Sequence, residues 1–145
     1  MDARPSSSLG KKTAIRVLAA GFLLTLSVLL IVASRLEPSE SGLGTHHQLG
    51  LPPCSVRLLW GIRCPSCGMT TSWAHLTKGN LFAATKANVG GVLLAFCLLS
   101  SVVPVTRMIR SGQMPSPLLI RNATVVLIGV VLVTLADWAI RLAVS

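Results

Sequence analysis

Three long apolar segments bounded by basic residues constrain this chain more than any other feature. They are residues 17–34, 87–106 and 122–140; the first two contain no charged residue, and the third contains only Asp137. A membrane-spanning helix needs about 17–25 apolar residues. Charged residues make up 12% of the chain, whereas a soluble domain carries about 25%. The sequence therefore predicts an all-α integral membrane protein with three transmembrane helices.

The first apolar segment has a second interpretation. Lys11 and Lys12 precede it, as basic residues precede the apolar core of a secretory signal peptide. That core is usually about 7–15 residues long, and residues 17–34 form a longer run. We therefore expect a retained helix, preceded by a basic, flexible N-terminal tail at residues 1–16.

The remaining segments connect these spans. We expect a cysteine-containing segment at 35–86, a basic connecting loop at 107–121 and a short tail at 141–145. Gly90 and Gly91 open the second span, and glycines there predict close helix contact.

A short helix is predicted within the cysteine-containing segment, before the second span. Met69, Trp73 and Leu76 recur at helical spacing, and Gly79 follows them. Asn80 can then cap a new helix that leads into the second span. The first of these helices has one apolar face, so we expect it to be amphipathic or re-entrant at the headgroup level.

The basic residues predict an orientation. They cluster in the tail and in the connecting loop, at Arg4, Lys11, Lys12, Arg16, Arg107, Arg110 and Arg121. Cytoplasmic loops carry such an excess, so the N-terminus is expected in the cytoplasm of a bacterial cell, with the protein in its inner membrane and the cysteine segment facing outward. Five basic residues in the cysteine segment argue the other way: Arg35, Arg57, Arg63, Lys78 and Lys86. The net charge of +9 does not indicate nucleic acid, because these residues flank apolar runs and the chain has no tyrosine.

Most of the chemistry is concentrated in the run Cys64-Pro65-Ser66-Cys67, with Cys54 ten residues upstream. Two thiols at this spacing form half of a tetrahedral metal site, for which zinc is the usual ion. Cys54 is the natural third ligand. The candidates for the fourth are His46, His47 and His75.

The same thiols allow two other interpretations. A disulfide among them would staple a loop that has no core of its own. Alternatively, Cys64 and Cys67 could serve as the redox pair of a membrane thiol–disulfide oxidoreductase. Cys67 lies just ahead of the helix expected from Met69, and a thiol at a helix start is more readily ionised. No catalytic set is visible, so we favour a non-enzymatic binding or assembly component. Its expected partners are the lipid bilayer and either another membrane protein or a second copy.

Two further polar positions lie in the spans. Asp137 precedes Arg141 by one helical turn, which is a favourable helix pair, and we interpret it as an interface anchor. The alternative is a transport subunit that uses Asp137 as a relay, because intramembrane carboxylates are often functional. Cys97 in the second span is interpreted as a small packing residue.

Residues 49–88 resemble a family of small bacterial membrane proteins catalogued as domain of unknown function 2752. The family pattern is Cys, a spacer, Gly-x-x-Cys-Pro-x-Cys-Gly-x-Thr, a short helix, Gly-Asp, and Asn or His followed by Pro. Here it is matched by Cys54, Gly61, Cys64-Pro65-Ser66-Cys67-Gly68-Met69-Thr70, Gly79 and Asn88. The chain departs from it at Thr71, where many members have Arg, at Asn80 in place of Asp, and at Val89 in place of Pro. The resemblance implies a membrane protein centred on its cysteines, and no reaction.

Overall fold

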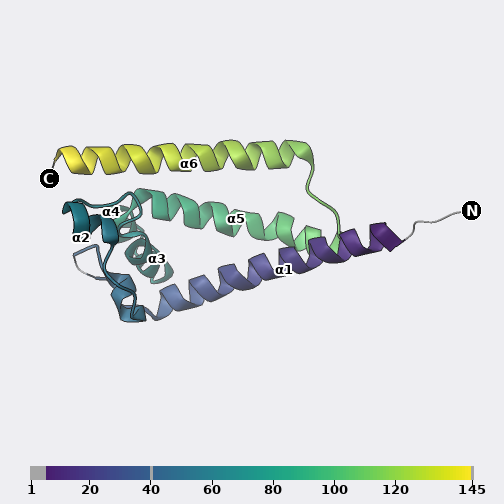
Figure 1. The fold of residues 1–145 in the computed structure, drawn as a ribbon, viewed down its shortest axis with the longest axis horizontal. Helices are drawn as coiled ribbons and strands as arrows, with labels where there is room; N and C mark the ends of the chain where they lie inside the picture. Colours follow the sequence, from purple (N-terminus) through teal and green to yellow (C-terminus); the bar gives the residue numbers. More distant parts are fainter. Residues whose placement is uncertain (1–5, 40, 145) are drawn as a thin grey trace, which may run out of the picture.

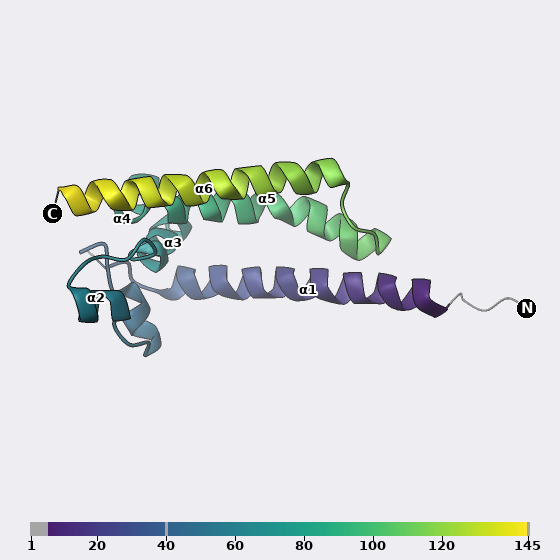
Figure 2. The same cartoon turned by 45° about the horizontal axis from the view of Figure 1, so that its top comes forward.

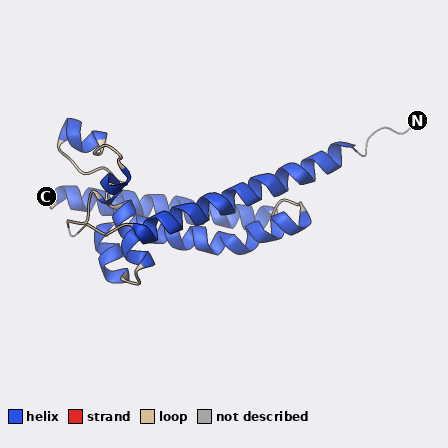
Figure 3. Cartoon of the chain, turned by 90° about the horizontal axis from the view of Figure 1, so that it is seen from below, coloured by secondary structure: helices blue, strands red, loops and turns tan. Residues whose placement is uncertain are grey.

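The computed structural model describes residues 6–39 and 41–144, and all regular structure within them is helical (Figures 1 and 3). The elements are α1 (Ser6–Arg35), the 3₁₀ helix η1 (Thr45–Leu49), α2 (Ser55–Trp60), α3 (Met69–Thr77), α4 (Leu81–Ala87), α5 (Val89–Ser111) and α6 (Pro117–Ala143). Three stretches of helix are long and apolar enough to cross a membrane, namely Leu9–Arg35, Val89–Ser111 and Pro117–Ala143. The predicted fold class is confirmed.

Each long helix runs antiparallel to the next long helix of the chain, and α5 contacts both α1 and α6. No contact joins α1 to α6 in the described part of the chain, so the three form an open row (Figure 2). Figure 1 shows the start of α1 and the α5–α6 connection at one end of the molecule. The short helices and the end of α6 gather at the other end. The described basic residues before the first span and those of the α5–α6 connection therefore share one end, and the cysteine segment shares the other with the C-terminal end of α6.

The helices extend beyond the apolar runs that predicted them. Helix α1 already begins at Ser6, so residues 6–16 are helical where a flexible tail was expected; residues 1–5 of that tail lie outside the description. Helix α5 continues to Ser111, and α6 begins at Pro117 after the N-cap Ser116, which shortens the connection to residues 112–116. The basic residues at these ends do not stop a helix, because long side chains can reach the headgroup region from a helical backbone.

Few side chains are buried, and most of the long helices face outward. Only Val130 is buried in α6 among the side chains that the structure describes. Apolar residues such as Leu132, which is 61% exposed, cover its surface. In water this surface would be costly, whereas lipid solvates it, and the backbone satisfies its own hydrogen bonds in a helix.

Two adjacent glycines let α5 approach two of its neighbours, α3 and α6, closely, as predicted. A Cβ on Gly90 would lie 2.7 Å from the Cβ of Thr134 in α6. A Cβ on Gly91 would lie 3.1 Å from the Oγ of Ser72 in α3. The pair therefore fits α6 on one side and α3 on the other, as small residues do between membrane helices.

The segment between the first two spans holds more structure than the single amphipathic helix and capped helix predicted. The caps of α4 and α5 follow the sequence closely: Asn80 Oδ1 accepts from the Ala83 N–H at 3.0 Å, as expected. Helix α4 stops at Ala87, however, and the extended residue Asn88 separates it from α5. Helices η1 and α2 were not anticipated.

Candidate metal and thiol centre

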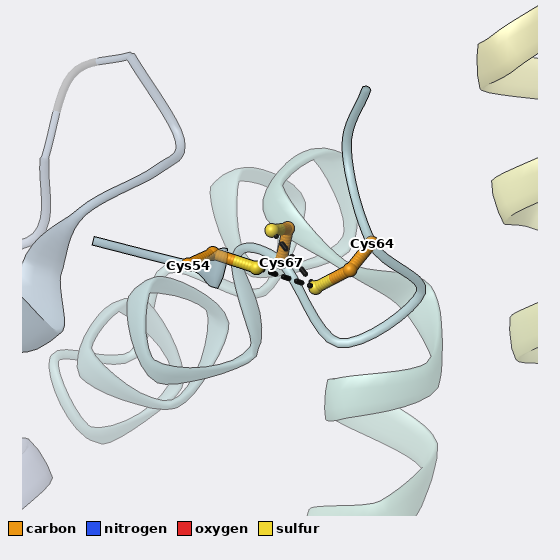
Figure 4. A group of neighbouring side chains, drawn as sticks. All are labelled: Cys54, Cys64 and Cys67. Carbon is orange, nitrogen blue, oxygen red and sulfur yellow. Dashed lines mark hydrogen bonds between the residues drawn. The ribbon is translucent and has the colours of Figure 1, made fainter. Parts of the chain in front are cut away.

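Three cysteine side chains from two separated segments meet at one point (Figure 4). Cys54 immediately precedes α2, and Cys64 and Cys67 lie on the turn between α2 and α3. The Cys54 and Cys64 sulfurs are 3.4 Å apart, and the Cys64 and Cys67 sulfurs are 3.0 Å apart. All three lie within 4.8 Å of one another and are half-buried. The structure thus brings together the three predicted thiols.

The turn that carries Cys64 and Cys67 is closed by its own backbone and by a glycine. The Cys67 N–H donates to the Cys64 carbonyl at 3.0 Å, and the Met69 N–H donates to the Ser66 carbonyl at 3.1 Å. Gly68 then starts α3 with a φ of 87°, a region that favours glycine. A Cβ there would lie 2.6 Å from the carbonyl oxygen of Ala87. The turn therefore packs directly against the junction of α4 and α5.

A buried asparagine fixes the turn to that junction. The Asn88 side-chain amide donates to the carbonyls of Pro65 at 3.0 Å and Cys67 at 3.1 Å. Its Oδ1 accepts from the Gly91 N–H at 2.8 Å and so caps α5. Asn88 is only 4% exposed. Sequence reasoning recorded Asn88 as part of the family pattern and missed this role, although an Asn directly before a helical apolar run is a cap signal.

The C-terminal end of α6 closes the other side of the centre. The indole N–H of Trp138 donates to the carbonyl of Arg63, next to Cys64. Arg141 donates to Asp137 Oδ2 at 2.8 Å and to the carbonyl of Lys86 at 2.8 Å. The predicted ion pair of Asp137 with Arg141 is therefore formed, and it joins α6 to the end of α4.

Cys64 and Cys67 differ in acidity because of their arrangement. Burial raises the pKa of Cys64, but hydrogen bonds to its sulfur from Cys67, Ser66 and Cys54 outweigh burial and lower that pKa from 9.0 to about 7. Burial, together with the bond to Cys64, raises the pKa of Cys67 to about 12. Cys64, which donates to Cys67 as a thiol, therefore ionises first and can then accept from Cys67 as a thiolate. The expectation that the helix start would activate Cys67 is wrong, because burial and the bond to Cys64 outweigh that position.

The three histidines lie outside the compact cysteine group of the described residues. A cavity of about 540 Å³ borders the centre and is lined by all three cysteines together with His46 and His47. Neither ring contributes to the group of ligand atoms within 4.8 Å, which contains cysteines alone in the described residues. His75 does not line this cavity; its backbone carbonyl accepts from Lys78 and Asn80 at the end of α3.

A buried pair of threonines lies beside the centre. Thr71 is 1% exposed, and its hydroxyl lies 2.7 Å from that of Thr45. This buried bond joins η1 to α3, next to the cavity.

The donor set fits a soft metal ion. Zinc binds thiolates at about 2.3 Å in a tetrahedron, which places sulfurs about 3.8 Å apart. The Cys54–Cys64 and Cys64–Cys67 sulfur pairs would each need to spread by less than about 1 Å to reach that spacing. A disulfide would use two of the three thiols and leave the third.

One of the comparisons with known proteins gives a match, which is to a family of unknown function. No curated protein sequence and no solved structure gives a significant match to the chain. Residues 54–102, which run from the first cysteine of the centre into α5, match the model of the family described as protein of unknown function (DUF2752), and this confirms the resemblance drawn from the sequence.

Proposed function

We propose that this chain is a membrane metal-thiolate protein, in which Cys54, Cys64 and Cys67 bind one zinc ion and the site serves binding or assembly rather than turnover. The convergence of three sulfurs from two segments carries the proposal. Thiolates are the ligands that select zinc over harder cations. Zinc sites with three protein ligands keep a fourth position open. Here that position would face the cavity, which supports a role in binding.

Metal analysis of the full chain, purified in detergent, tests this proposal. We expect one zinc per chain, retained in Cys97→Ser, because Cys97 lies in α5 outside the cluster. We expect Cys54→Ser to lose most of the zinc, since two thiolates alone bind it weakly. Wild-type protein that stays metal-free after incubation with zinc, with all of its thiols free, would refute the proposal.

A second candidate function is thiol–disulfide exchange, favoured by the lowered pKa of Cys64. The Cys64 thiolate would attack a partner disulfide and release one partner thiolate, and Cys67 would then displace the other and close the Cys64–Cys67 disulfide. Cys54 separates the two functions, because exchange needs only a pair of thiols. In Cys67→Ser the mixed disulfide on Cys64 should accumulate, as seen on non-reducing gels, and Cys54→Ser should leave exchange intact. Absence of any mixed disulfide would remove this candidate.

A transport function that uses Asp137 has less support than anchoring. Asp137 pairs with Arg141, which also holds the end of α4. We propose that the pair anchors α6, so Asp137→Asn should lower the thermal stability in detergent. A change in ion flux in proteoliposomes at unchanged stability would instead favour transport.

We further propose that the protein lies in the bacterial inner membrane with its N-terminus in the cytoplasm. One end of the molecule carries Lys11, Lys12 and Arg16 of α1 together with Arg107 and Arg110 of α5, and Arg16 donates there to the carbonyl of Arg110 at 3.3 Å. This arrangement follows the positive-inside rule. In a cysteine-free background, a membrane-impermeant maleimide should label Ser55→Cys in intact cells and spare Gln113→Cys. The reverse pattern would invert the orientation.

A further inference from the structure

The cavity beside the cysteines is lined by apolar side chains and by polar groups. Its apolar side includes Leu29 and Val32 from the last turns of α1, and Leu36, which follows that helix. His46, His47 and Arg57 contribute polar groups, and the thiols line the same space. The volume of about 540 Å³ falls in the range of about 300–1,000 Å³ that is typical of small-molecule sites.

The position of the cavity gives it access to lipid. Leu29 and Val32 belong to the membrane-span stretch Leu9–Arg35. The apolar side therefore lies at the end of the span, near the boundary of the bilayer. An apolar molecule dissolved in the membrane could enter there without crossing water, whereas a purely polar ligand would not be stabilised by the α1 surface.

The described residues that line the cavity include a cationic side chain and no anionic one. Arg57 is always cationic at physiological pH, and the two histidines are hydrogen-bond donors. No aspartate or glutamate occurs among the lining residues that the structure describes. A carboxylate head is therefore favoured and an ammonium head is disfavoured.

We propose that this cavity binds a long-chain carboxylate, with its hydrocarbon chain against α1 and its head toward Arg57 and the thiols. A cavity of this size accepts one drug-sized molecule, which suits a single chain rather than a two-chain phospholipid. This binding does not depend on the metal. A carboxylate is also a zinc ligand, so the same head would fill the open fourth position, a consequence that rests on the proposed function.

Photo-crosslinking of the full chain in phosphatidylcholine nanodiscs tests this inference. The probe is palmitate that bears a terminal diazirine. We expect the labelled peptides to map to the α1 end, between residues 29 and 36, and unlabelled palmitate to compete. Hexadecyltrimethylammonium, which has the same chain length and a cationic head, should compete at least tenfold less well. Equal competition by both amphiphiles would overturn the inference, as would competition by phosphatidylglycerol alone.

Two pairs of variants keep the test specific. Val32→Trp should fill the cavity and reduce labelling at least fivefold, whereas Leu24→Trp places the same bulk on an exposed position of α1 that does not line the cavity. Arg57→Gln should weaken palmitate binding about fivefold, as expected for an exposed ion pair. The control Arg107→Gln should leave palmitate binding unchanged, because Arg107 lies in the last turns of α5 and does not line the cavity. Labelling that is unchanged in both Val32→Trp and Arg57→Gln would refute the assignment.

Labelling of the Cys54→Ser variant separates this inference from the proposed function. If the wild-type chain holds no zinc but palmitate labels both proteins at the α1 end, the cavity assignment stands and the metal site fails. If zinc binds and palmitate labels neither protein, the metal site stands and the cavity assignment fails.

Discussion

Asn88→Asp should separate the two tasks of this buried side chain. The aspartate keeps the oxygen that caps α5 through Gly91, but it loses the amide donors to the carbonyls of Pro65 and Cys67. The substitution therefore leaves the α5 cap in place and removes the link to the cysteine turn. It also puts a negative charge against two carbonyl oxygens beside the thiols.

The size of the effect follows from the bonds lost. Each neutral hydrogen bond contributes about 1 kcal/mol net, so two lost donors cost about 2 kcal/mol, and charge repulsion adds to that. If the loss acts on the ordered turn that binds metal, 2 kcal/mol corresponds to about a 30-fold lower zinc affinity. This agrees with the roughly 10–100-fold effect of removing groups that orient metal ligands.

Asn80→Asp is the matched control. Asn80 is also a helix N-cap, and its Oδ1 accepts from the Ala83 N–H in the same way. An aspartate can do the same, so its zinc affinity and stability should equal those of the wild-type protein. Zinc affinity is measured by competition with a metallochromic indicator, and stability by thermal unfolding in detergent. If Asn88→Asp and Asn80→Asp behave alike in both assays, the link between Asn88 and the turn does not support the centre.

Two further predictions concern packing and pH. Gly90→Ala should destabilise the protein by about 1–3 kcal/mol in the same thermal assay, because the new Cβ would clash with Thr134. The control Gly129→Ala should be neutral or stabilising, since its Cβ meets nothing within 4 Å. Equal effects of the two substitutions would disprove the close contact. In metal-free protein, iodoacetamide should alkylate Cys64 with a rate midpoint near pH 7, while Cys67 stays slow, and a shared midpoint near 9.0 would contradict the hydrogen-bond arrangement. Because folding lowers the pKa of Cys64, ionisation of this thiol stabilises the folded chain fully above pH 9.0, and this stabilisation is lost as the pH falls through about 7. Folding raises the pKa of Cys67, so above pH 9.0 ionisation of Cys67 favours the unfolded chain.

The features of the fold that could be predicted are those that depend only on residues close together in the sequence. The three spans follow from apolar length alone. The pair of Asp137 with Arg141 follows from helical spacing, and the Asn80 cap follows from a residue type before a helix. Helices such as α2, with six residues, are too short to show a period, which explains why the cysteine segment was predicted with too little structure.

The sequence by itself determined an all-helical membrane chain with its thiol chemistry between the first two spans. Only the tertiary structure decided that Cys54 joins Cys64 and Cys67, that His75 lies elsewhere, and that a cavity opens beside them. The same holds for the bond from Trp138 to Arg63, which spans 75 positions of the chain. Such contacts depend on how whole helices pack, and α5 brings the distant segments together because its glycines allow close approach on both sides.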